Sequence, residues 1–221
     1  MLSILSRNKL QVREEAFQFG TGLRLLYISD LHLTRWVPHI VDQLLDVCRR
    51  SCPDLILLGG DLLDLANGSE LLAFFIHMCG CSVWAIAGNH DRFVGVEVVR
   101  GCVESAGGHW LEGEIELHPR LSLSGVCHPS QAERSILCAH DPALFPKAVK
   151  AGFDLTLAGH LHGGQCIFYE RNGKLYPGTL LHQWTGDRFT YSGSNLLVSK
   201  GVHDTLPLRW NCPREVLLCC C

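Results

Sequence analysis

The sequence predicts a fold of helices and strands, α/β (α+β) in class. Two mixed β-sheets are expected to pack face to face as a sandwich flanked by helices. Short apolar runs bounded by Gly and Pro are typical of buried strands. In the first half of the chain, these runs alternate with segments that have the apolar spacing of helices. After residue 113 the pattern changes to short alternating segments, which indicate strands with one solvated face. The apolar runs cover residues 23–29, 54–60, 82–88, 135–139 and 154–158.

Four segments carry the apolar spacing of helices. Pro38 suits a first helical turn, and Ser69 is a candidate N-cap. Gly107 and Gly152 follow the third and fourth segments, as expected of residues that end a helix. The predicted helices cover residues 38–50, 69–79, 93–106 and 142–151. The later predicted strands cover residues 114–117, 121–124, 165–169, 195–199 and 215–219, and residues 1–22 are expected to form a lead-in strand or loop.

Composition indicates one well-buried globular domain spanning residues 1–221, with a motif-bearing core at about 23–212. The net charge is −3 and no basic block occurs, so a nucleic-acid partner is not indicated. The first residues lack the apolar core of a signal peptide, and no stretch is long enough to span a bilayer. We therefore expect a cytoplasmic protein, with peripheral contact to the inner membrane left open, whose 12 cysteines are reduced.

Each of the five apolar runs stops at residues that can bind metal. In layered α/β folds the carboxyl ends of strands form the ligand-binding crevice, so these side chains are expected to converge. Nitrogen and oxygen donors of this kind suit manganese, iron or zinc. The pattern therefore predicts a two-metal hydrolase. The strand-end residues are Asp30 and His32, Asp61, Asn89 with His90 and Asp91, His140, and the pair His160 and His162.

The first two strand ends offer carboxylates. On an extended backbone, Asp30 and His32 would point the same way and could bind one ion. Asp61 follows two glycines that allow a close backbone approach, and its two carboxylate oxygens can bridge two cations. Each motif alone is also compatible with a polar turn. Asp64 is near enough to support a metal ligand from behind, but it is expected to be solvated or to cap a helix.

The third strand end combines three roles. Asn89 offers a neutral carbonyl oxygen as a metal ligand. His90 need not bind metal and can act as a general acid or stabilise phosphoryl charge. Asp91 is expected to hold the His90 ring in one orientation.

The last two strand ends supply histidines. His140 lies at a predicted strand tip, and His160 and His162 at alternate positions would share a face and bind two adjacent ions. Gly163 and Gly164 would leave room for a substrate phosphate and expose backbone N–H groups to it.

These motifs in this order resemble the calcineurin-like metallophosphoesterase family. The Gly-rich stretch at 163–165 and the segments 198–203 and 206–213 are similar to a bacterial subgroup of phosphodiesterases that includes a UDP-2,3-diacylglucosamine diphosphatase of lipid A synthesis. The resemblance implies that one metal is bound by Asp30, His32, Asp61 and His162. It implies that Asp61, Asn89, His140 and His160 bind the other, and that His90 is the catalytic histidine.

The resemblance implies hydrolysis of a phosphoester by a metal-bridging hydroxide, with Mn²⁺ or Fe as the expected metal and Zn²⁺ as a further option. Three functions stay open: a general phosphodiesterase or phosphatase, a UDP-2,3-diacylglucosamine pyrophosphatase, and a non-catalytic protein-binding scaffold. Residues 125–135 are short where relatives often carry a helix, and His203 stands where a Gly is common, so the substrate is not fixed by the resemblance.

Overall fold

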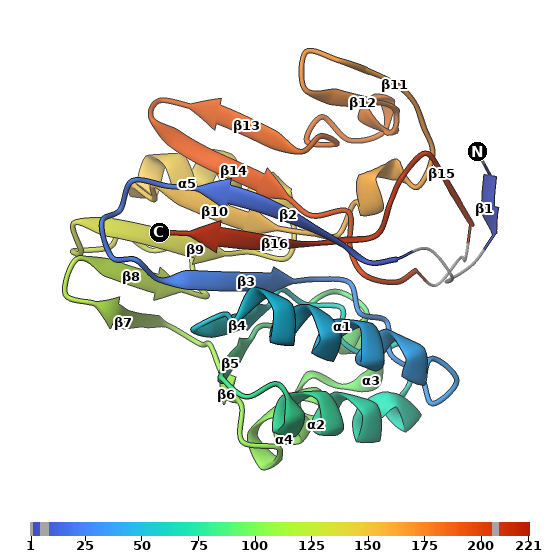
Figure 1. Cartoon of the computed structure of the whole chain (residues 1–221). Coiled ribbons are helices and arrows are strands. Elements are labelled where there is room, and N and C mark those ends of the chain that lie inside the picture. The colour runs from blue at the N-terminus through green and yellow to red at the C-terminus, as the bar shows by residue number, and fades with distance from the viewer. Residues whose placement is uncertain (1, 5–8, 205–207) are drawn as a thin grey trace.

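The computed structural model describes residues 2–4, 9–204 and 208–221. Two parts of the chain lie outside the described residues. They are residues 1 and 5–8 of the predicted lead-in, and residues 205–207, which include the first two residues of the segment 206–213. Two six-stranded sheets form the centre of the fold (Figure 1). Because parallel and antiparallel pairings occur in both sheets, the prediction of two mixed sheets is confirmed.

The strands of each sheet are arranged as follows. The first sheet has the order β2 (Gln11–Ala16), β16 (Glu215–Cys220), β3 (Arg24–Ile28), β4 (Leu55–Leu58), β5 (Ser82–Ala85) and β6 (His109–Trp110). The second has the order β13 (Arg188–Tyr191), β14 (Ser194–Val198), β10 (Leu155–Ala158), β9 (Arg134–Cys138), β8 (Leu121–Ser124) and β7 (Glu114–His118). Two small sheets pair β1 (Leu2–Ile4) with β15 (Leu208–Trp210), and β11 (Ile167–Arg171) with β12 (Lys174–Pro177).

Helices cover the outer faces of both large sheets (Figure 1). Those on the first sheet are α1 (Pro38–Ser51), α2 (Ser69–Met78) and α4 (Val96–Ser105), and α5 (Phe145–Ala151) lies against the second. Short helical turns are α3 (Asp91–Val94), η1 (Ala66–Gly68), η2 (Pro142–Leu144), η3 (His162–Gly164) and η4 (Gly178–Leu180).

Alternation along the central strands divides the core into layers. In β3, Leu26 and Ile28 pack toward the helices, whereas Leu25 and Tyr27 pack between the sheets. The same alternation occurs in β4. Because these strands are buried on both faces, their sequences are continuous apolar runs and do not alternate between apolar and polar residues. Burial of both faces fixes the register, and with it the place where each strand ends.

Some helix boundaries differ from the sequence-based prediction. The segment 93–106 forms two helices because Gly95, at φ 105°, interrupts it, and the first helix begins at Asp91. Ser69 is not an N-cap: it is the first residue of α2, and its hydroxyl donates to the carbonyl of Ala66 in the preceding turn. Local propensity identified the helices, but the tight turn at η1 was not visible in the apolar pattern.

The C-terminal segment extends the first sheet to its end. β16 continues to Cys220, and Cys221 is buried, with its N–H donating to the carbonyl of Leu23. The terminal cysteines are therefore part of the folded domain. All 12 cysteines are free thiols. Among the described residues, no helix combines the length and apolar character needed to cross a bilayer.

Loss of a side chain from the layer between the sheets is expected to destabilise the fold. Leu123 in β8 is fully buried there, so Leu123→Ala should lower the free energy of unfolding by about 2–5 kcal/mol through lost burial and a residual cavity. Leu181→Ala is the matched control, because Leu181 is 93% exposed and its loss should change stability by less than about 0.5 kcal/mol. Urea unfolding monitored by circular dichroism measures both, and equal midpoints would contradict this assignment of the core.

Candidate metal centre and active site

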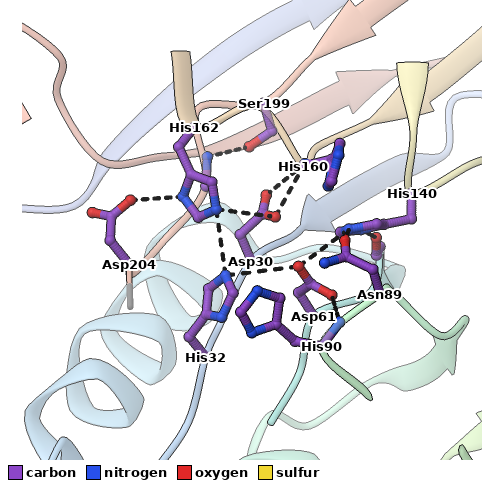
Figure 2. Close-up of polar contacts among 12 residues, drawn as sticks. Asp30, His32, Asp61, Asn89, His90, His140, His160, His162, Ser199 and Asp204 are labelled. Carbon is purple, nitrogen blue, oxygen red and sulfur yellow. Dashed lines mark hydrogen bonds and ion pairs between the residues drawn. The ribbon is translucent and has the colours of Figure 1, made fainter. Parts of the chain in front are cut away.

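Five parallel strands deliver the candidate ligands to one edge of the two sheets. β3, β4 and β5 are mutually parallel in the first sheet, and β9 and β10 are parallel in the second. Their carboxyl ends meet, so side chains far apart in the sequence converge in one cluster (Figure 2). The residues brought together are Asp30, His32, Asp61, Asn89, His90, His140, His160 and His162.

The backbone at these strand ends is left-handed rather than extended. Non-glycine residues seldom adopt positive φ, and such positions concentrate at functional sites. Five candidate ligands have positive φ: Asp30 (55°), His32 (44°), Asp61 (54°), His160 (71°) and His162 (48°). The expectation that Asp30 and His32, and likewise His160 and His162, share a face of an extended strand was therefore wrong. Left-handed residues after β3, β4 and β10, and not the strand pleat, aim these five side chains inward.

The first ligand cluster contains Asp30, His32 and His162, whose ligand atoms lie within 4.8 Å of one another. Nε2 of His32 is 3.3 Å from Nε2 of His162, and the latter is 3.7 Å from Oδ1 of Asp30. Asp30 and His32 are almost fully buried. Three donors thus face one point from two different sheets.

The second ligand cluster contains Asp61, His140 and His160, again within 4.8 Å. Nε2 of His140 lies 3.2 Å from Oδ2 of Asp61 and 2.9 Å from Oδ1 of Asn89. Gly88, next to Asn89, packs so closely that an added Cβ would lie 2.1 Å from Oδ1 of Asp61. A glycine is therefore required for the two strand ends to approach this closely.

Asp61 belongs to the second ligand cluster and also faces the first. Its Oδ2 is 3.2 Å from Nε2 of His140 in the second cluster and 3.8 Å from Nε2 of His32 in the first. Its Oδ1 accepts a hydrogen bond from the backbone N–H of His90 at 2.7 Å, which fixes the carboxylate in place. A single carboxylate oxygen thus faces donors from both clusters.

Outer partners orient three of the histidines in the same way. Nδ1 of His32 lies 2.6 Å from Asp64, Nδ1 of His140 is 2.9 Å from the carbonyl of Gly59, and Nδ1 of His162 is 2.6 Å from Asp204. An acceptor at Nδ1 places the proton there, so Nε2 carries the lone pair.

These tautomers fit metal ions. With Nδ1 of both rings protonated, the facing Nε2 atoms of His32 and His162 are two acceptors 3.3 Å apart, a contact that needs a cation or proton between them. Imidazole and carboxylate donors with such outer partners are the usual surroundings of bound divalent metals. The residues present therefore fit the group that the strand-end motifs predicted.

The ring of His90 is held by Asp64 and not by Asp91. Nδ1 of His90 lies 2.9 Å from Oδ1 of Asp64, the same atom that accepts from His32. The expectation that Asp64 is a solvated or capping residue was wrong, since its carboxylate serves two rings. Asp64 follows Asp61 by three residues, and this spacing was the signal in the sequence that could have revealed it.

The predicted role of Asp91 is corrected by its contacts. Its carboxylate is fully buried and accepts backbone N–H groups of Leu62, Leu63 and Gly88 at 2.8–3.0 Å. Burial raises the pKa of Asp91, although these three hydrogen bonds oppose the shift. Asp91 therefore ties the loop after β4 to the loop after β5, and its side chain does not orient His90.

The two glycines that were expected to bind phosphate are closely packed. Gly164 donates its N–H to the carbonyl of Leu161, so this group is not available to a phosphate. Added Cβ atoms would lie 2.8 Å from Sγ of Cys212 at Gly163 and 2.9 Å from Cα of Gly178 at Gly164. Both glycines have positive φ, and only this residue type combines that conformation with such close contacts.

Asp204 is a site residue that the sequence analysis missed. It is 6% exposed and lies 2.6 Å from Nδ1 of His162, while Arg209 donates to both of its oxygens at 2.5 and 2.8 Å. Although burial raises it, contacts with His162 and Arg209 leave the pKa of Asp204 well below its ordinary value. It follows β14, whose carboxyl end lies at the same edge, but no ligand pattern marks it.

Metal binding is expected to release a proton from His140. Burial lowers the pKa of His140, but the hydrogen bond to Asp61 outweighs it and raises the pKa to about 9. The metal-free protein therefore carries a proton on this ring at neutral pH, and a metal ion must displace it. Between pH 7 and 9 the affinity should rise by about tenfold per pH unit, with about one proton released. Titration calorimetry in buffers of different ionisation enthalpy measures this release, and an affinity independent of pH would contradict it.

The fold and the site together define a metal-dependent phosphoesterase, and comparison with known proteins agrees. Residues 23–194 match the Calcineurin-like phosphoesterase superfamily domain. The chain belongs to this superfamily, as the resemblance of its motifs predicted.

Individual relatives give the same assignment, and a solved structure has a similar fold. The chain is 28% identical to Phosphodiesterase YaeI of Escherichia coli over 218 residues. The matched region covers 88% of this chain and 80% of that protein. It is 27% identical over 239 residues to an uncharacterized metallophosphoesterase of Aquifex aeolicus, covering 95% and 89% of the two chains. A dimetal phosphatase from Danio rerio has a similar fold, with a TM-score of 0.55 and 11% identity over 84% of this chain and 90% of that one.

Proposed function

We propose that the chain is a single-domain, dinuclear-metal-dependent hydrolase of phosphoester bonds and that its main reaction is that of a phosphodiesterase. The observation that carries the proposal is the position of Asp61, whose Oδ2 faces Nε2 of His140 and Nε2 of His32. A carboxylate placed between two sets of donors is suited to bridge two cations. The similarity to Phosphodiesterase YaeI supports the choice of a diester over a monoester.

The ligand sets follow from the two clusters. One ion would be held by Asp30, His32, His162 and the shared Asp61. The other would be held by Asp61, Asn89, His140 and His160. Metal ions bound here would supply Lewis-acid polarisation of the phosphoryl oxygens and would lower the pKa of a water molecule. We infer manganese or iron as the metal, with zinc as a further option, because mixed imidazole, carboxylate and amide donors suit all three.

His90 has the role of proton donor to the leaving group. Asp64 holds the Nδ1 proton, so Nε2 is the atom that exchanges a proton with substrate. The side chain of His90 is 33% exposed, far more than the ligand His32 at 1%. As the oxygen of a water molecule bonds to phosphorus and the ester P–O bond breaks, the water loses a proton to solvent and the leaving alkoxide takes a proton from the protonated ring of His90. The ring then regains its proton from solvent. Asp64 would stabilise the positive charge that the ring carries before it gives up that proton.

The experiment that tests this proposal is hydrolysis of a phosphoester panel by metal-free protein to which Mn²⁺, Fe²⁺, Zn²⁺ or no metal is added. The panel contains a chromogenic diester, a monoester and a UDP-linked lipid pyrophosphate. We expect turnover of the diester that depends on added metal. Preference for the lipid pyrophosphate would assign the chain to the alternative reaction, and absence of turnover with every metal would refute the phosphoesterase proposal. The converging ligands and the superfamily membership favour an enzyme over a non-catalytic scaffold.

A further inference from the structure

A pocket of about 560 Å³ adjoins the second ligand cluster. Asn89, His140 and His160 form one of its walls, so a phosphoryl group bound at the metal centre would lie at this end of the pocket. The pocket then extends toward Trp110 and the loop that follows Ser124. Its volume is in the range of sites that hold small organic molecules.

Apolar side chains form part of the pocket lining away from the ligands. Ile86, Val96, Trp110, Leu111 and Leu144 line it. Apolar side chains of this kind favour an apolar or aromatic group, and the partly buried Trp110 is an aromatic residue among them. The substituent on the substrate phosphate is therefore expected to be an organic group with little polarity at this point.

One cationic side chain, Arg92, lines the same pocket. Arg92 lies in α3, two residues after His90, and its side chain is exposed. The guanidinium of Arg100 makes ion pairs with Glu104 and Glu112. For the side chain of Arg92, no hydrogen bond or ion pair is found within the described part of the chain. A guanidinium without a carboxylate partner at a binding pocket is suited to pair with an anionic ligand group.

The other charged lining residue outside the ligand cluster, Asp141, has a backbone partner. Asp141 lines the pocket, but its Oδ1 accepts a hydrogen bond from the N–H of Ala143 at 2.7 Å and caps η2. Its carboxylate is thus engaged with the backbone of a short helix, while the guanidinium of Arg92 remains available to substrate.

We infer that this pocket binds the organic substituent of the substrate and that Arg92 is a specificity-determining residue for a second anionic group on it. The substrate class is a phosphodiester whose organic group is apolar or aromatic and carries a further carboxylate or phosphate. The inference rests on the proposed function, because it places the scissile phosphate at the metal centre. It extends that function by stating what the rest of the substrate looks like.

Three chromogenic diesters with the same leaving group test the inference. They are phenyl 4-nitrophenyl phosphate and its analogues that carry a carboxylate or a phosphonate on the phenyl ring. Arg92→Gln should lower kcat/KM for the anionic diesters about 10- to 100-fold more than for the uncharged one, mainly through KM. Arg92→Lys should restore part of this loss. The two anionic analogues show whether the carboxylate or the tetrahedral anion is preferred.

Two further variants separate the parts of the pocket. Arg100→Gln is the matched control, because Arg100 lies on α4 and its partners are surface glutamates, and it should leave all three diesters unaffected. Trp110→Ala should raise KM for all three diesters alike, since an apolar contact serves the phenyl ring and not its charge. The metal content of each variant is measured alongside.

The outcomes distinguish the inference from the function on which it rests. If the unaltered protein hydrolyses the diesters and Arg92→Gln affects charged and uncharged diesters equally, the inference is overturned and the proposed function stands. If the unaltered protein hydrolyses none of them with any metal, the proposed function fails and the inference fails with it.

Discussion

Replacing Asp61 with Asn is expected to produce the largest loss of metal and activity of any single substitution in this chain. The variant removes the negative charge that faces both His140 and His32 while keeping nearly the same shape. Replacing this carboxylate by an amide leaves the remaining donors without the negative charge that would balance the two cations. We expect metal content to fall from about two ions per chain to about one or fewer, and kcat to fall by at least about 1,000-fold.

The reason for this expectation lies in the protonation of the site as well as in its geometry. Burial raises the pKa of Asp61, but the hydrogen bond and charge of His140 prevail and lower it to about 2. Asp61 is therefore ionised at every pH at which the protein would be assayed, and an amide cannot replace that charge. Asp46→Asn is the matched control, because Asp46 lies on the exposed face of α1 in an ion pair with Arg50. Metal analysis that finds two ions in Asp61→Asn would contradict the bridging role.

Replacing His90 with Ala is expected to lower turnover and leave the metal ions in place. Nδ1 of its ring is paired with Asp64, and the ring packs edge-on against His32 at 4.6 Å between centroids. Because His90 is in neither proposed ligand set, we expect both sets to remain in the variant. Loss of a general acid costs about 100- to 10,000-fold in kcat. The loss should be smaller for diesters with good leaving groups, because those leave without a proton.

A leaving-group series measures this dependence directly. The unaltered protein and His90→Ala are compared on aryl diesters whose phenols differ in pKa, with metal content determined for both. His77→Ala, at an exposed position on α2, is the control for removal of a histidine. If His90→Ala loses metal in parallel with activity, His90 acts as a ligand or a structural residue and the assignment as proton donor is wrong.

The strand-end pattern allowed most of the site to be predicted from the sequence. Asp30, Asp61, His140 and His160 lie together because each follows a parallel strand that is buried on both faces, and such strands are recognisable as apolar runs. The carboxyl ends of parallel strands share an edge, so the order of runs in the sequence was enough to predict the meeting point. Their roles as metal ligands remain proposals.

Other features could not be predicted because they depend on contacts between distant segments. The left-handed backbone at Asp30 and His32 arises from hydrogen bonds to the loop after β4, where the N–H groups of these residues donate to Gly60 and Asp61. The contact between Asp204 and His162 joins two loops that follow β14 and β10. No local pattern in the sequence encodes a pairing of this kind.

Asp64 and Asp91 show the same limit at closer range. Both are acidic residues near His90, and the sequence places Asp91 next to it, which suggested the wrong partner. In the fold, the turn at the start of α3 directs Asp91 inward to backbone N–H groups, while the ring of His90 faces Asp64. Adjacency in sequence does not decide which side chains meet where a strand passes into a helix.

The most direct test of the account is electron paramagnetic resonance of the protein reconstituted with Mn²⁺. Ions that share the carboxylate of Asp61 must be close neighbours, so the spectrum at about two equivalents should show exchange-coupled Mn²⁺ pairs. A spectrum that contains only isolated Mn²⁺ at every metal ratio would contradict a shared centre formed at the ends of these strands.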